Sequence, residues 1–279
     1  MKKITTIVLI LFLMLFAGVA LTQEPIMDRL SVSFSDPSKP GLVEVGLISG
    51  SITVTGYNGK EVTIEAITRT KKITGDEVEI NDKAKGMKKI QLTTTGLSVE
   101  EENNVIEINV ESWKKAIDLT IKVPTKTSLK LSCLNNGNIK VDNVEGEIEV
   151  NNTNGAVTLK NISGSAVAHA LNKDVIVTFN RVDPKKTMSF SSLNGDIDIT
   201  FPSNFKATAK LKSTQGDIYS DFDISEQEVV KDFLKEEKRK EGGKYRISFE
   251  SGIKVKINGG GPEVLFETFN GDIYIRKGK

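Results

Sequence analysis

The sequence contains very little of the side chains that most catalytic and metal sites use. Its 279 residues include one cysteine, one histidine and one tryptophan, and aromatic residues make up 6%. A single cysteine excludes an internal disulfide, a CxxC redox pair and an iron–sulfur centre. A single histidine excludes multi-histidine metal sites, so we expect no metal and no cofactor.

An excess of charge of one sign is also missing. The formal net charge is +1, from 38 Lys and Arg against 37 Asp and Glu, and no basic stretch alternates with aromatic residues. A surface that binds a polyanion needs a basic excess. We therefore expect no nucleic-acid partner.

Long hydrophobic runs are absent except near the N-terminus. Lys2 and Lys3 precede an uncharged apolar run over residues 4–21, which closes with small residues. This pattern is typical of a secretory signal peptide, residues 1–20, cleaved after Ala20 or within the next three residues. We expect an exported protein, located in the periplasm, at the cell surface or outside the cell. The run is also just long enough for an uncleaved membrane anchor, and only then would a membrane contact follow.

A short phrase recurs through the second half of the chain. A small or polar residue and a glycine are followed by one residue and then by two aliphatic residues that flank a third. The glycine position falls at 137, 146, 155, 164 and 173, where Lys173 replaces it, and later copies are centred on 195, 216 and 271. A further apolar residue, seven positions after the glycine, has the wrong parity to share the strand face of the first two. The chain must therefore bend inside each unit.

Two folds compete for this phrase. Asn-Gly between alternating apolar residues is a strong hairpin signal and would give an antiparallel meander. A meander would keep its alternation unbroken, whereas this one breaks in every unit, so a coil of parallel strands is favoured. We predict an all-β fold, a parallel β-helix or β-solenoid with rungs of about 18–22 residues.

The length of a rung comes from alternate copies, which resemble each other more than adjacent copies do. One class steps by 18, 18, 22 and then 21 residues, with a later copy at the end of the chain: Asn136, Asn154, Asn172, Asn194, Gln215 and Asn270. Stacked amides can bond along such a column, which predicts an Asn/Gln ladder beside a column of glycines. The other corner tolerates change, with Val182-Asp183-Pro184 and Phe201-Pro202-Ser203 in the glycine places.

We expect two regions after the signal peptide. Residues 21–128 form an N-terminal β region of early rungs with an antiparallel cover, and residues 129–279 form the regular solenoid. A helix is predicted at 225–241, because Ser225 and Glu228 make a capping box ahead of an amphipathic pattern. The basic C-terminal residues at 276–279 are predicted to protect the last exposed strand edge.

Few residues suggest chemistry. Four aspartates follow the glycine position, and a column of carboxylates could bind cations or act on a sugar: Asp174, Asp196, Asp217 and Asp272. Aspartate is also a common turn residue, which is the interpretation we adopt. His169 is expected on the outer surface and Cys133 in the core. We predict no catalytic, cofactor-binding or metal-binding residue.

The closing part of the chain allows a comparison with a known family. Asn-Gly-Asp-Ile at 194–197 and 270–273, the pair Val123-Pro124, and the glycine-rich segment 257–261 resemble the bacterial "putative adhesin" family of β-strand-repeat envelope proteins. This resemblance implies a β-helix-like fold, export, and an interaction at the surface or in the envelope. It implies no catalytic residues.

The expected function is therefore that of a non-catalytic exported cell-envelope protein, a binding, adhesion or scaffold module. Its partner would be an envelope protein, a glycan or another copy of itself. One alternative is a carbohydrate-active β-helix enzyme that acts on a polysaccharide, which should cluster acidic, basic and aromatic residues on one face. Another is a membrane-anchored envelope-stress sensor domain.

Overall fold

The computed structural model describes residues 26–69, 94–110, 115–237 and 246–278. All of the elements in these ranges are β-strands, joined in one solenoid-like sheet, so the all-β prediction is confirmed. None of the described residues forms a helix with the length and apolarity that crossing a membrane requires. The predicted signal peptide, residues 1–20, lies outside the described residues.

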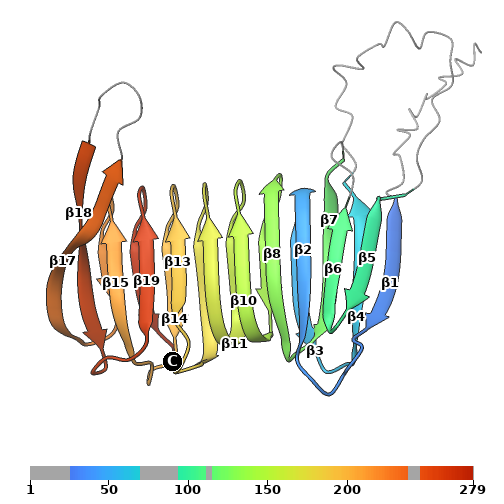
Figure 1. The fold of residues 1–279 in the computed structure, drawn as a ribbon, viewed down its shortest axis with the longest axis horizontal. Helices are drawn as coiled ribbons and strands as arrows, with labels where there is room; N and C mark the ends of the chain where they lie inside the picture. Colours follow the sequence, from blue (N-terminus) through green and yellow to red (C-terminus); the bar gives the residue numbers. More distant parts are fainter. Residues whose placement is uncertain (1–25, 70–93, 111–114, 238–245, 279) are drawn as a thin grey trace, which may run out of the picture.

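The strands follow one another along the long axis of the molecule (Figure 1). In chain order they are β1 (Met27–Ser33), β2 (Gly41–Ser49), β3 (Ile52–Tyr57), β4 (Glu61–Thr68), β5 (Leu97–Glu102), β6 (Val105–Val110), β7 (Ile117–Pro124), β8 (Thr127–Asn135), β9 (Ile139–Asp142), β10 (Glu145–Asn152), β11 (Val157–Ala170), β12 (Val175–Val182), β13 (Met188–Ser192), β14 (Ile197–Phe201), β15 (Ala207–Ser213), β16 (Ile218–Ser220), β17 (Ile224–Glu237), β18 (Arg246–Ile257), β19 (Glu263–Thr268) and β20 (Ile273–Lys277).

Strand pairing divides the sheet into two layers. Layer A has the order β5, β6, β2, β8, β10, β11, β13, β19, β15, β18, β17. Layer B has the order β1, β4, β7, β3, β9, β11, β12, β14, β20, β16. Strand β11 belongs to both layers, because residues 157–160 pair with β9 whereas residues 163–170 pair with β10.

Neighbouring strands run parallel through the middle of both layers, for example β10 with β11 and β12 with β14. Antiparallel pairs occur toward the ends, where β1 pairs with β4, β5 with β6 and β17 with β18. An antiparallel meander is therefore excluded for the central strands.

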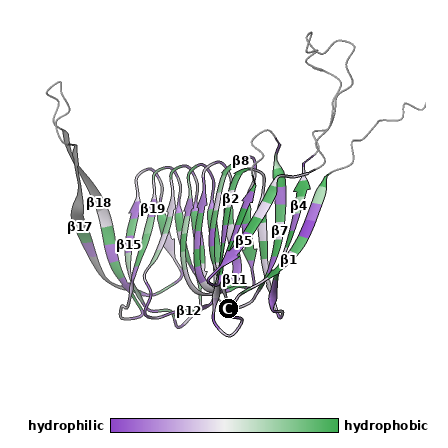
Figure 2. Ribbon diagram, turned by 45° about the vertical axis from the view of Figure 1, so that its right-hand side comes forward, coloured by the Kyte–Doolittle hydropathy of each residue, from purple (hydrophilic) through white to green (hydrophobic). Residues whose placement is uncertain are grey.

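The core lies between the layers and follows from the alternation of side chains along each strand. In β9, Ile139 and Val141 are buried while Lys140 and Asp142 point outward. Figure 2 shows the same alternation of hydrophobic and hydrophilic residues along the other strands. Cys133 is buried in this core, as predicted, and its burial raises the pKa of the thiol.

Strand order in space departs from chain order near both ends. The last two strands, β19 and β20, lie between β13–β14 and β15–β16. Near the other end, β2 and β3 lie between β6–β7 and β8–β9. The prediction that Arg276 and Lys277 protect the last exposed strand edge is therefore wrong, since β20 lies between β14 and β16. Lys279 lies outside the described residues.

The predicted helix at 225–241 is also wrong. Strand β17 takes up Ile224–Glu237 and pairs antiparallel with β18. Two register shifts interrupt this pairing, one between Ser225 and Gln227 and one between Val230 and Phe233. Each shift inserts residues that break the two-residue period, so the apolar residues of a bulged strand can take on the spacing of a helix face.

Candidate functional site

Two kinds of corner connect the layers, and the first, which we call the glycine corner, is built by backbone contact. A side chain on Gly155 would place its Cβ 1.8 Å from the carbonyl oxygen of Gly137. On Gly271 it would lie 2.2 Å from the oxygen of Gly195. Successive turns of the chain approach too closely here for any residue with a side chain in that direction.

The predicted amide ladder runs along this corner. Each Nδ2 donates to the Oδ1 of the preceding member at 2.7, 2.8, 3.0 and 3.0 Å, through the series Asn135, Asn154, Asn172, Asn194 and Asn270. The first member is Asn135, whereas the sequence pattern predicted Asn136. Asn136 instead has a positive φ of 63° and donates to the Ser49 hydroxyl.

The four aspartates also form a column, although not in their chain order. Asp174 accepts the backbone N–H of Asp196, Asp196 that of Asp272, and Asp272 that of Asp217, at 3.0, 2.8 and 2.8 Å. No three acidic, histidine or cysteine side chains within the described ranges could hold a metal ion together. Each of the three accepting carboxylates thus bonds to the backbone of the next turn, as a structural aspartate would.

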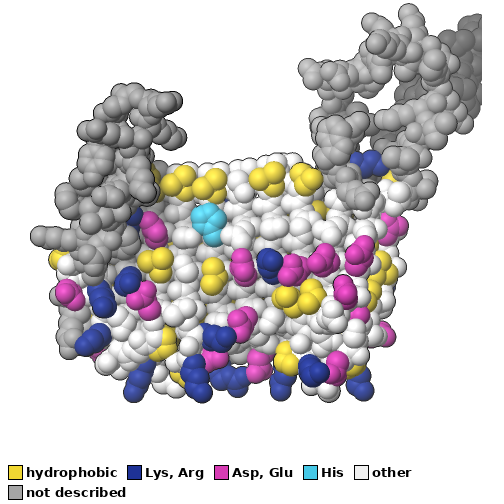
Figure 3. Space-filling model, in the orientation of Figure 1, with side chains coloured by type: hydrophobic (Ala, Val, Ile, Leu, Met, Phe, Trp, Pro, Cys, Tyr) yellow, Lys and Arg dark blue, Asp and Glu magenta, His cyan; other side chains and the backbone are white. Residues whose placement is uncertain are grey.

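His169 lies on the outer side of layer A, where its Nδ1 is 2.8 Å from the Ser191 hydroxyl on the next strand (Figure 3). A histidine and a serine alone lack the orienting acid and the oxyanion donors that acyl transfer uses.

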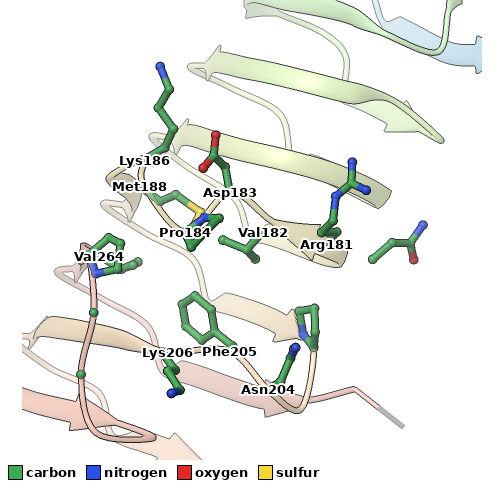
Figure 4. A pocket seen from close by; sticks show the side chains of 15 residues that line it. Arg181, Val182, Asp183, Pro184, Lys186, Met188, Asn204, Phe205, Lys206 and Val264 are labelled. Carbon is green, nitrogen blue, oxygen red and sulfur yellow. The ribbon is translucent and has the colours of Figure 1, made fainter.

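The opposite corner, which we call the proline corner, is irregular and hollow. A cavity of about 500 Å³ opens there between three turns, those that join β12 to β13, β14 to β15 and β18 to β19 (Figure 4). Its apolar lining comes from Val182, Pro184, Met188, Phe205 and Val264. Phe205, Met188 and Val264 are buried in the core, so the floor of the cavity is part of the folded scaffold.

Charged side chains border the cavity. Arg181 forms an ion pair with Glu145, and Lys186 pairs with Glu147 at 2.7 Å, which raises the pKa of the lysine. Asp183 and Lys206 also line the cavity. The mouth therefore offers groups of both signs around an apolar floor.

Two further hollows extend the cavity along layer A. The first, of about 490 Å³, shares residues 181–184 with the cavity. The second, of about 710 Å³, shares Pro40, Ser128, Glu147 and Ser165 with the first. We call the three together the corner groove, which runs from residues 103–105 beside β6 to Lys206 ahead of β15.

The corner groove was not predicted as a site, but the sequence contained a signal for it. The regular repeat fails at Val182-Asp183-Pro184 and at Phe201-Pro202-Ser203, and most of these residues now line the cavity or its floor. The glycine-rich segment after β18 supplies Gly260, Gly261 and the third proline, Pro262.

An apolar row borders the other side of layer A. Exposed hydrophobic side chains stand beside the amide ladder as two pairs on adjacent turns, Ile48 with Leu134 and Leu193 with Phe269. Hydrophobic side chains mark the upper rim in Figure 3. Layer A is thus bounded by an apolar rim on one side and by the charged groove on the other.

Comparison with known proteins finds one family model and several solved structures that are similar to this chain. Residues 133–257 match the family model described as Toastrack DUF4097, and the resemblance predicted from the sequence is confirmed. The chain is similar to a "putative cell adhesion protein" from Clostridium sporogenes, with a TM-score of 0.47, 14% identity, and coverage of 91% of this chain and 100% of that one. It is also similar to a "putative adhesin" from Bacteroides fragilis, with a TM-score of 0.40, 11% identity, and coverage of 92% of this chain and 98% of that one. No curated protein matches the chain.

Proposed function

We propose that this protein is an exported, non-catalytic binding module of the cell envelope, and that its corner groove holds an extended segment of a partner protein. The observation that carries the proposal is the continuity of the groove, whose hollows share lining residues from one end to the other. Export is supported by the signal-peptide pattern of residues 1–20.

The dimensions of the groove suit an extended peptide. Between β6 and β15 it crosses about seven strand spacings, or roughly 34 Å. An extended chain of about ten residues covers that distance. A segment of this length contacts several turns at once, and many weak contacts can then add up to a stable complex.

The chemistry of the groove also favours a peptide. The cavity at one end can accept a bulky apolar side chain as an anchor, because its floor is formed by buried core residues. Acidic and basic residues line the groove together, namely Glu145, Glu147, Asp183, Lys126, Arg181 and Lys186. Such a mixture favours a partner whose side chains carry both signs over a polyanion.

The absence of catalysis is part of the proposal. Phe205 is the aromatic residue among those lining the groove, and it is buried, so the groove lacks the exposed rings that polysaccharide-cleaving enzymes use. The carboxylates of Glu145 and Glu147 already form ion pairs. Neither feature favours the alternative of a carbohydrate-active enzyme in the groove.

We further infer that the central strands form the predicted rungs of about 18–22 residues, with one strand in each layer. Support comes from the bonded amides, since Asn154, Asn172 and Asn194 are 18 and 22 residues apart. The parallel pairing of β10 with β11 and of β12 with β14 agrees with this arrangement. A rigid stack of this kind would keep the groove straight.

A peptide-selection experiment tests the proposal. Random ten-residue peptides are selected on the full chain, and the affinity of a selected peptide is measured by fluorescence anisotropy. Asn204→Trp should fill the mouth of the cavity and weaken binding by about tenfold or more, which corresponds to about 1.4 kcal/mol. Ser203→Trp is the matched control, because Ser203 is equally exposed but is not part of the lining.

Three results would contradict the proposal. The first is a selection that yields no binding peptide. The second is a selected peptide that binds the Asn204→Trp variant as tightly as the Ser203→Trp variant. The third is release of soluble sugars from a polysaccharide by the purified protein, which would replace the binding module with an enzyme.

A further inference from the structure

We propose that layer B carries a carbohydrate-binding platform, built around Tyr219 and Tyr274, that takes a neutral glycan. The two rings lie on adjacent strands, β16 and β20, with their centroids 5.3 Å apart and their planes 10° apart. Tyr219 keeps 49% of its surface exposed although it stacks on Tyr274. None of the residues of this platform lines the corner groove, so the inference does not depend on the function proposed above.

The platform continues across neighbouring strands. In register, Tyr219 lies beside Tyr274, Tyr274 beside Asp198, and Asp198 beside Ile176. All four side chains point outward, because side chains alternate along a strand and the residues next to these four in sequence face the core. The surface therefore changes from aliphatic through charged to aromatic over a short distance.

Polar groups are fixed next to the rings. The guanidinium of Arg276 lies 5.1 Å from the centroid of Tyr274. Its Nε and Nη2 donate to the two carboxylate oxygens of Asp198 at 2.6 and 2.9 Å. A guanidinium has five N–H groups, so three remain for a ligand after these two bonds.

The tyrosine hydroxyls are also held in place. The Tyr274 hydroxyl donates to Asp272 at 2.9 Å and the Tyr219 hydroxyl to Asp217 at 3.3 Å. The hydrogen bond to Asp272 raises the pKa of Tyr274 to about 12, and the charge of Asp217 raises the pKa of Tyr219. Both phenols therefore stay protonated at neutral pH, and each oxygen keeps lone pairs that can accept a ligand hydroxyl.

Charge and shape favour a neutral sugar. The platform holds three carboxylates, those of Asp198, Asp217 and Asp272, and one cation, Arg276. This excess of negative charge repels nucleic acids and acidic glycans. A sugar ring presents an apolar C–H face to an aromatic ring while its edge donates and accepts hydrogen bonds. The exposed ring of Tyr219 would contact the apolar face, and the fixed donors and acceptors would bond to the edge.

The same residues are poorly suited to cleave a sugar. A general acid for glycosidic cleavage needs a raised pKa. The backbone N–H of Asp217 and the Tyr274 hydroxyl both bond to Asp272 and lower the pKa of its carboxyl. The Asp198 carboxylate is engaged with Arg276 on both of its oxygens. The arrangement is that of a binding surface.

A glycan array printed with neutral and acidic glycans tests the inference on the full chain, followed by calorimetric titration of the neutral glycan that is retained best. Tyr219→Ala should weaken binding about tenfold, whereas Tyr219→Phe, which keeps the ring, should stay within about threefold. Tyr57→Ala serves as the tyrosine control, because Tyr57 lies on β3, away from the platform. Asn204→Trp should leave glycan affinity unchanged, which separates this site from the groove.

The unfolding midpoint of each variant is measured in parallel. If Tyr219→Ala folds poorly, Tyr219→Leu replaces it in the titration, because leucine lacks the aromatic ring but still covers the strand. The same loss of glycan affinity, about tenfold, is expected. The inference fails if no neutral glycan is retained, if acidic glycans or aromatic peptides bind in preference, or if both substitutions leave the affinity unchanged. Cleavage of the bound glycan would also overturn it.

Discussion

Both corners of this protein turn the chain from one layer to the other, but different contacts hold them. At the glycine corner, side-chain amides and carboxylates bond to the next turn, and glycine allows the backbones to touch. At the proline corner, neighbouring turns differ in sequence, stacked phenyl rings form the core beneath the cavity, and charged groups remain at its mouth. The turns of the glycine corner touch one another, whereas the proline corner encloses a cavity, which is why the irregular corner is the better candidate site.

The largest expected loss of stability comes from removing a buried phenyl ring beneath the proline corner. Phe201 is fully buried, and its ring stacks on Phe205 with centroids 3.9 Å apart and on Phe179 at 5.3 Å. Phe201→Ala should lower the free energy of unfolding by about 3–5 kcal/mol, because it leaves a large cavity. Urea denaturation measures the change. The exposed Phe269 is the control, and equal losses for Phe269→Ala and Phe201→Ala would contradict this account of the corner.

An intermediate effect is expected at the glycine corner. In Gly155→Ala the new methyl group would lie 1.8 Å from a backbone oxygen, so the turns must separate. The expected loss of unfolding free energy is about 2–3 kcal/mol. In Gly46→Ala the new atom meets its nearest neighbour at 3.7 Å, and stability should hardly change. If the two variants are equally stable, close backbone contact does not govern this corner.

The smallest effect concerns the pH dependence of the aspartate column. The backbone N–H of Asp217 lowers the pKa of Asp272, so this carboxylate stabilises the folded state above its pKa in the unfolded chain, about 3.9. That contribution is lost as the pH falls through the lower folded-state pKa. Asp272→Asn should therefore flatten the fall in unfolding free energy below about pH 5, because an amide oxygen accepts the same bond at any pH. The side-chain oxygen of Asn138 already accepts such a bond from the backbone N–H of Ala156. An unchanged acid profile would show that the hydrogen bond contributes nothing.

Periodic features could be predicted from the sequence because they arise from local rules. The all-β class, the amide ladder and the burial of Cys133 follow from turn chemistry and from strand alternation. The one-residue error at Asn136 arose because both Asn135 and Asn136 are turn formers, and only the backbone decides which amide faces the ladder. The aspartate column was predicted, but Asp272 lies between Asp196 and Asp217, which no reading in chain order could reveal.

Features that depend on non-local pairing could not be predicted. The bulges of β17 disturb its period enough to imitate a helix, and its partner, β18, follows it only after an intervening segment. The position of β20 between β14 and β16 needs a comparison of pairing energies across the whole chain. The cavity depends on three turns that are distant in sequence, so only the failure of the repeat at Val182-Asp183-Pro184 pointed to it.

The place of the last two strands, β19 and β20, has a consequence for how the molecule folds. Residues 263–277 fill a slot between strands that are synthesised well before them. Until the ribosome has released those residues, the neighbours on either side of the slot have no partner along their facing edges. Strands β13 and β14 can therefore join β15 and β16 in one sheet only after residues 263–277 are in place, so this part of the sheet is completed last.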